Sequence, residues 1–179
     1  RDFVEAAKNS VRAGFQALEI HAAHGYLIHQ FLSPITNNRT DEYGGSLENR
    51  ARLLIEIVIG IRAAVGDDVP LFIRFSATDY REDGWNEEQT VQVAKWCADA
   101  GADLFDISSG GLITGVQIPT GPGYQVPLSE YVARGVEEPV TAVGQITSAA
   151  QAEEILQARE IEVIMLGRAE LRDPHWPLR

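Results

Sequence analysis

Three polar ring side chains lie within six residues near the start of the chain: His21, His24 and Tyr26. They follow a short apolar run that ends at Ile20, which predicts that they stand at the carboxyl end of a β-strand. Two imidazoles and a phenol in that position can donate hydrogen bonds to a carbonyl, bind a metal or transfer a proton. The cluster is therefore a candidate site rather than part of a core.

Metal binding is the weakest of these three hypotheses. His21 and His24 have no third ligand in view, and they lack the helical position and the adjacent glutamate of the zinc-protease motif. A purely structural role would be the ordinary interpretation of a single histidine. It explains poorly why two histidines and a tyrosine occur together. We expect no metal. Polarisation of a carbonyl is the attractive hypothesis if another part of the chain binds an electron source.

The composition indicates a folded protein without a nucleic-acid partner. The chain has 179 residues, 45% of them hydrophobic, which is enough to bury a core in one domain over residues 1–179 or in part of a larger one. A net charge of −11 argues against binding a phosphate backbone. Cys97 is the only cysteine, so we expect a buried apolar residue and a reducing compartment, the cytoplasm. The longest apolar run, 53–61, is too short to cross a membrane.

Short apolar runs alternate with amphipathic runs along the whole chain, which is typical of βα units around a parallel sheet. Each apolar run is nearly free of polar residues, as expected for strands buried on both faces. The expected strands are 18–20, 71–75, 104–108, 140–143 and 163–166; the expected helices are 3–13, 46–66, 86–101 and one that begins at Ser148.

Five such units with polar residues after the strands predict part of a (β/α)₈ TIM barrel, an α/β fold whose chemistry lies at the carboxyl face. A whole barrel takes about 250 residues. We therefore expect this chain to carry about strands 4 to 8, or else to form an open α/β sheet.

Glycines follow the last three expected strands, and they include Gly110, Gly111, Gly144 and Gly167. Each alone would be read as a turn, but together they let backbone N–H groups approach an anion, and a phosphate site after strands 7 and 8 recurs in these barrels. Arg168 adds a bidentate phosphate donor, although a surface ion pair would also explain it.

Arg74 lies inside the apolar run 71–75, where a charge needs a partner. An electron-rich heterocycle is one candidate partner, and a nearby carboxylate such as Asp79 is the other.

Longer segments of the chain resemble the Old Yellow Enzyme family of FMN-dependent ene-reductases. The resemblance runs through essentially the whole chain, and the paired histidines are similar to those of its bacterial, thermophilic-like branch. The residues that carry it are the segments 21–34 and 38–50, Arg74, 109–111, 143–144 and 166–168.

The resemblance implies a reaction for the ring cluster. His21 and His24 would bind the carbonyl or nitro oxygen of a small activated alkene, reduced FMN would deliver a hydride, and Tyr26 would protonate the α-carbon. NADPH or NADH would be the electron donor. The conserved-looking block 38–50 is interpreted as structural, with a tight turn, a capped helix and charge pairs.

The resemblance also implies the flavin contacts. Arg74 would lie beside the N1 and O2 edge of the flavin, where a positive charge stabilises the reduced ring. The phosphate would be held by Gly144, Gly167 and Arg168. The other expected cofactor-binding residues are Ser109, Gly110 and Gly111 near the phosphate and Gln125 near the flavin.

Five strands of an eight-stranded barrel leave two exposed sheet edges. We therefore expect a homo-oligomer or a partner chain that completes the barrel. Two alternatives stay open: a half-barrel without flavin that serves only in assembly, and a related flavin barrel that reduces dienoyl thioesters or oxidises a tertiary amine. Relatives of the second kind carry an iron–sulfur cluster, for which Cys97 alone is insufficient.

Overall fold

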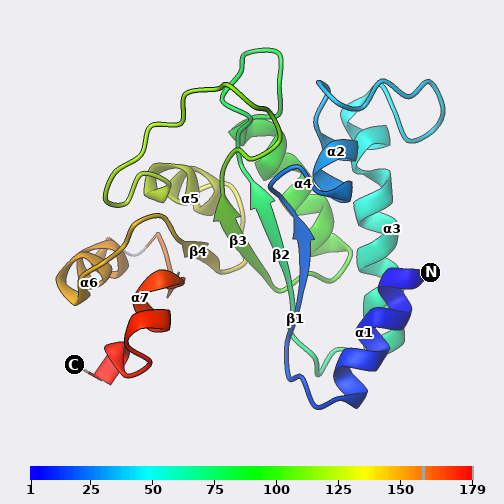
Figure 1. Ribbon diagram of the computed structural model, residues 1–179. Helices are drawn as coiled ribbons and strands as arrows, with labels where there is room; N and C mark the ends of the chain where they lie inside the picture. Colours follow the sequence, from blue (N-terminus) through cyan, green and yellow to red (C-terminus); the bar gives the residue numbers. More distant parts are fainter. Residues whose placement is uncertain (159, 179) are drawn as a thin grey trace.

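The computed structural model describes residues 1–158 and 160–178. Within them, five strands form one parallel sheet whose spatial order is the chain order (Figure 1). Parallel neighbours require crossover connections, which the helices between the strands supply. The α/β prediction is thereby confirmed. The strands are β1 (Leu18–Ala22), β2 (Leu71–Ser76), β3 (Leu104–Ser108), β4 (Val140–Ala142) and β5 (Val163–Ile164).

Successive helices pack against one another and form a layer on one side of the sheet: α1 contacts α3, α3 contacts α4, and α4 contacts α5 (Figure 1). Among the described residues, the helices are α1 (Asp2–Arg12), α2 (Leu27–Leu32), α3 (Leu47–Val65), α4 (Glu87–Asp99), α5 (Val126–Ala133), α6 (Ala149–Gln157), α7 (Arg168–Arg172) and the 3₁₀ helix η1 (Trp176–Leu178).

Side-chain oxygens cap three of these helices as the sequence predicts. Ser46 accepts from the backbone N–H of residue 49, Asn86 from that of residue 89, and Ser148 from that of residue 151. Gly66 ends α3 with a positive φ of 78°. Helices α2, α5 and α7 were not predicted, since six, eight and five residues are too few for a helical period to show.

The two faces of the sheet differ in polarity, although β3 and β4 are buried on both faces nearly throughout, as expected. The face toward the helices is a core, with Ile73, Phe75, Phe105 and Ile107 fully buried. The opposite face carries polar side chains in one row, where His21, Arg74, Asp106 and Thr141 are register partners across four strands. This polar row crosses the strands close to their carboxyl ends.

The sheet is open within the described residues: β1 and β5 each pair on one side only. No helix of the described part is long and apolar enough to cross a membrane. Cys97 is fully buried in α4, as predicted, and burial raises the pKa of its thiol.

Candidate active site

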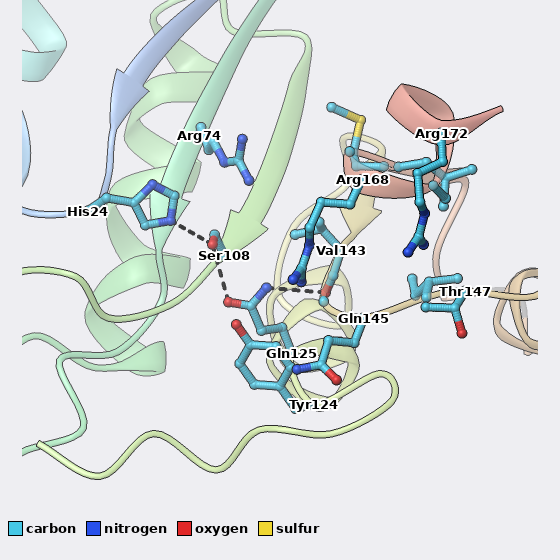
Figure 2. A pocket seen from close by; sticks show the side chains of 16 residues that line it. His24, Arg74, Ser108, Tyr124, Gln125, Val143, Gln145, Thr147, Arg168 and Arg172 are labelled. Carbon is cyan, nitrogen blue, oxygen red and sulfur yellow. Dashed lines mark hydrogen bonds between the residues drawn. The ribbon is translucent and has the colours of Figure 1, made fainter. Parts of the chain in front are cut away.

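A cavity of about 540 Å³ opens at the carboxyl ends of β3, β4 and β5 (Figure 2). It lies where the loops after parallel strands meet, the usual place for a ligand in an α/β fold. Six of the predicted site residues line it, together with Ser108, Tyr124 and Arg172. The six are His24, Arg74, Gln125, Gly144, Gly167 and Arg168.

The three rings of the sequence cluster meet beside this cavity. The ring centroid of His21 lies 5.2 Å from that of His24 and 5.1 Å from that of Tyr26. His24 lines the cavity, whereas His21 and Tyr26 stand next to it. Tyr26 is 63% exposed, so its hydroxyl is open to a ligand or to solvent.

His24 is held by contacts from two other strands. Its backbone N–H donates to Ser76 Oγ at 3.0 Å, and Ser76 in turn donates to the carbonyl of Gly110 at 2.8 Å. The ring Nε2 lies 2.7 Å from Ser108 Oγ. These contacts stabilise a φ of 55°, a left-handed conformation that non-glycine residues seldom adopt. The cluster is therefore fixed by the ends of β2 and β3.

Glycines allow the loop after β1 to lie directly on the loop after β3. A Cβ added at Gly111 would lie 2.8 Å from His24 Cα, and one added at Gly25 would lie 2.7 Å from the Gly111 carbonyl oxygen. Neither position can accept a side chain without moving backbone. Gly111 consequently lies directly against His24. Ser109, Gly110 and Gly111 do not line the cavity, and their place near a phosphate stays a prediction.

Gly111→Ala should displace His24, and Gly115→Ala is the matched control. Both glycines have positive φ, 84° and 81°, so both substitutions strain the backbone alike. A Cβ at Gly115 meets no atom within 4 Å. We expect Gly111→Ala to lower the free energy of unfolding by about 1–3 kcal/mol more than the control does. Urea titration measures the difference, and equal losses would show that the two loops are not interlocked.

Arg74 points into the cavity from β2 (Figure 2). Its Nε lies 3.2 Å from Asp106 Oδ2, and the fully buried Asp106 also accepts from Thr141 Oγ1 at 2.6 Å. The prediction of Asp79 as the protein partner of Arg74 is wrong, because the Asp79 carboxylate faces His29 instead. Among the described residues, the terminal nitrogens of Arg74 have no hydrogen-bond acceptor, so they are available to a ligand.

Two further arginines line the cavity from α7, one turn apart. Arg168 and Arg172 have no carboxylate partner within the described part of the chain, although the protein carries a net charge of −11. A Cβ built on Gly167 meets nothing within 4 Å, so the missing side chain leaves open space at the cavity wall. Three arginines and this opening make the cavity suitable for an anionic ligand. The i, i+4 spacing from Arg168 could have identified Arg172.

Gln125 forms part of the cavity wall and is 3% exposed. Its Oε1 accepts from Ser109 Oγ at 2.5 Å and from Ser108 Oγ at 3.2 Å, while Nε2 donates to the Val143 carbonyl at 3.3 Å. These bonds fix the amide between the ends of β3 and β4. Through Ser108 the same network reaches the ring of His24 (Figure 2).

Both histidines of the cluster are neutral at neutral pH. Burial, followed by the charge of Arg74, lowers the pKa of His24 to about 4. The same two causes, in the same order, lower the pKa of His21. A neutral imidazole carries one N–H. Because Ser108 Oγ donates to Gln125, the N–H of His24 is on Nε2 and faces Ser108, so His24 donates to a ligand oxygen only when the ligand replaces Ser108 as its acceptor.

The low pKa of His24 predicts a loss of stability in mild acid. The unfolded chain takes up a proton at this ring near pH 6.5, whereas the folded chain takes it up only near pH 4. Stability from this site is thus present above pH 6.5 and is lost as the pH falls toward 4. A histidine NMR titration measures the pKa, and urea unfolding of the His24→Gln variant should show a flatter pH dependence. A pKa near 6.5 would contradict the prediction.

The arrangement can hold an anion and offer a phenolic proton, and it can donate two hydrogen bonds to one oxygen if a ligand replaces Ser108 as the acceptor of His24. Within the described residues, no group of three or more His, Cys, Asp or Glu could hold a metal ion.

Comparison with known proteins points to a flavin family. A family model described as NADH:flavin oxidoreductase / NADH oxidase matches residues 1–179. The NADPH dehydrogenase of Halalkalibacterium halodurans is 50% identical over 175 residues, which cover 98% of this chain and 51% of that protein. The chain thus spans about half the length of the curated relatives it matches.

Solved structures give the same result. A 2-naphthoyl-CoA reductase in complex with 2-naphthoyl-CoA matches 98% of this chain with a TM-score of 0.87 and 38% identity, covering 27% of its own chain. An Old Yellow Enzyme homologue from Zymomonas mobilis matches 99% of this chain and 49% of its own, with a TM-score of 0.82 and 28% identity. The five-stranded sheet accordingly corresponds to part of a (β/α)₈ barrel.

Proposed function

Because this chain belongs to the NADH:flavin oxidoreductase / NADH oxidase family, the family of Old Yellow Enzyme, we propose that it contributes the substrate-activating rings and the phosphate side of the flavin site to an FMN-dependent ene-reductase. The substrate is a small alkene conjugated to a carbonyl or nitro group, and NADPH or NADH is the electron donor. The observation that carries the proposal is the cluster of His21, His24 and Tyr26 beside a cavity lined by three arginines without acid partners at their terminal groups.

The charge of the cavity suits the phosphate and the electron-rich edge of FMN. Arg168 and Arg172 would hold the phosphate, and Gly167 leaves room for it. Arg74, fixed by Asp106, would lie against the electron-rich edge of the ring system, with Gln125 on the adjoining wall. When bound, FMN supplies the hydride chemistry, and these residues bind and orient it.

His21 and His24 would bind the oxygen of the substrate. On substrate binding, His24 would exchange its bond to Ser108 for one to the substrate, so that each neutral imidazole donates one N–H. Two donors on one oxygen would stabilise the negative charge that develops when the double bond accepts a hydride. Burial, followed by the charge of Arg74, lowers the pKa of both rings, so they act as neutral hydrogen-bond donors.

Tyr26 would supply the proton. Its ring contacts His21, so a substrate oxygen bound at the histidines places the α-carbon within reach of the phenol. A phenol O–H can donate a proton to an enolate-like carbon. The carbon–carbon double bond is then saturated.

A thioester substrate is the second candidate. The likeness to a 2-naphthoyl-CoA reductase favours it, since a thioester carbonyl can accept the same two hydrogen bonds. The open edges at β1 and β5 also suggest that a second copy or a partner chain completes the barrel. If the chain served only in assembly, its partner would bind at these edges and no flavin would bind in the cavity.

Half-reaction kinetics tests the proposal. The purified chain is loaded with FMN, reduced anaerobically by NADPH, and mixed with 2-cyclohexenone, a dienoyl-CoA or unactivated cyclohexene. We expect flavin reoxidation by the enone and none by cyclohexene. Faster reoxidation by the dienoyl-CoA would favour the thioester candidate, and equal rates with all three compounds would exclude activation by the ring cluster.

A further inference from the structure

A buried imidazole–carboxylate pair lies directly behind the ring cluster. His29 in α2 and Asp79 after β2 have exposed fractions of 0% and 1%, and His29 Nε2 lies 3.0 Å from Asp79 Oδ1. Neither residue lines the cavity. A buried ionisable pair contributes little net stability compared with an apolar pair of the same size. Its presence here calls for an explanation other than stability.

The other nitrogen of His29 binds the backbone of the catalytic loop. Gly25 lies between His24 and Tyr26 in the chain, and its backbone N–H donates to His29 Nδ1 at 3.0 Å. Nδ1 must therefore be unprotonated, and the single proton of the neutral ring is on Nε2, facing the Asp79 carboxylate. The tautomer of His29 is thus determined at both nitrogens.

Asp79 is itself fixed as a carboxylate. Its Oδ2 accepts from Ser33 Oγ at 2.6 Å and from the backbone N–H of Trp85 at 2.9 Å. Burial alone would raise the pKa of Asp79, but the close His29 imidazole and the hydrogen bonds from Ser33 and Trp85 together lower it. The carboxylate is therefore ionised and cannot turn away from His29.

From this chain of contacts we propose that His29 is a positioning residue for substrate activation, and that Asp79 fixes its tautomer. The inference rests on the proposed function, because it assigns His29 to the loop whose neighbours bind and protonate the alkene. Gly25 has φ 77°, and without an acceptor its partly buried N–H would draw the loop toward another partner. His24 and Tyr26 flank that peptide, so a shift there moves both rings.

Two substitutions separate this role from simple packing. Asp79→Asn keeps the shape and an oxygen for Ser33 and Trp85, but presents an amide N–H to His29 Nε2. The proton of the ring must then move to Nδ1, where it faces the N–H of Gly25. His29→Asn, in contrast, keeps an acceptor near the position of Nδ1, whereas His29→Leu has none. Ser33→Ala is the matched control, because it removes one bond to Asp79 without changing the tautomer of His29.

The first readout is ligand affinity of the FMN-loaded chain. With 4-hydroxybenzaldehyde as the probe, we expect Asp79→Asn and His29→Leu to raise its Kd roughly tenfold and His29→Asn and Ser33→Ala to change it by less than about threefold. The Kd for FMN should be unchanged in all four, since neither residue lines the cavity. Parallel losses of FMN and phenol affinity, or a loss in His29→Asn equal to that in His29→Leu, would overturn the assignment.

The second readout does not need flavin. In the ¹⁵N-labelled chain, we expect a scalar coupling across the hydrogen bond between the Gly25 amide nitrogen and His29 Nδ1, and its loss in Asp79→Asn. Absence of the coupling in the parent chain would overturn the inference. A coupling together with no FMN uptake would support the positioning contact while contradicting the proposed function.

Discussion

The Tyr26→Phe variant should reduce an activated alkene on the order of 10²–10⁴ times more slowly than the parent chain, because it lacks the phenolic proton. Reduction of the bound flavin by NADPH should be unchanged, since that step needs no proton from Tyr26. The ring packing against His21 is retained in phenylalanine, so the structural perturbation is small. Stopped-flow absorbance follows the two half-reactions separately.

Tyr131→Phe is the control for this substitution. Tyr131 is also exposed, at 42%, but it lies on α5 and does not line the cavity. It should leave both half-reactions unchanged. Equal slowing of both half-reactions in Tyr26→Phe would exclude Tyr26 as the proton donor.

The Arg74→Gln variant should lose both stability and flavin affinity. Removing the guanidinium leaves the buried Asp106 without its ionic partner, which costs about 3–5 kcal/mol of unfolding free energy for a buried pair, and less here because Arg74 is 28% exposed. Loss of a charge-assisted bond should raise the Kd for FMN by roughly 10- to 100-fold. Urea unfolding and quenching of FMN fluorescence measure the two effects.

The double variant Arg74→Gln/Asp106→Asn separates the two effects. A neutral amide at position 106 can still bind Thr141 and has no charge to compensate, so most of the stability should return. The affinity for FMN should stay low. Recovery of FMN binding in the double variant would show that Arg74 acts only by balancing Asp106.

The position of the site could be predicted from the sequence because parallel strands bring their carboxyl ends to one edge. His24, Arg74, Gln125, Gly144 and Arg168 lie far apart in the chain, yet each lies in or near the carboxyl end of a strand or at the start of a helix at that edge. The meeting of His24, Arg74, Gly144 and Arg168 follows from the α/β alternation, whereas Gln125 was expected only from the family resemblance. The roles assigned to them stay predictions.

Other features depend on register and could not be predicted. Asp106 faces Arg74 only because β2 and β3 pair with these residues opposite one another, and no local pattern encodes that offset. Asp79 was the nearer acid in sequence, but it turns toward α2, an element too short to show a period. The close contact of Gly111 with His24 could not be predicted either, because close approach to a ligand and close approach to His24 require the same missing side chain.

The most direct test is an absorbance titration of the purified chain with FMN, followed by 4-hydroxybenzaldehyde. We predict uptake of FMN and then a new long-wavelength band, because a phenolate held by His21 and His24 lies over the electron-poor oxidised ring. The His21→Ala/His24→Ala variant should take up FMN without developing the band. No FMN uptake, or a band of equal strength in that variant, would contradict the account of a flavin cavity beside a ring cluster that binds the substrate oxygen.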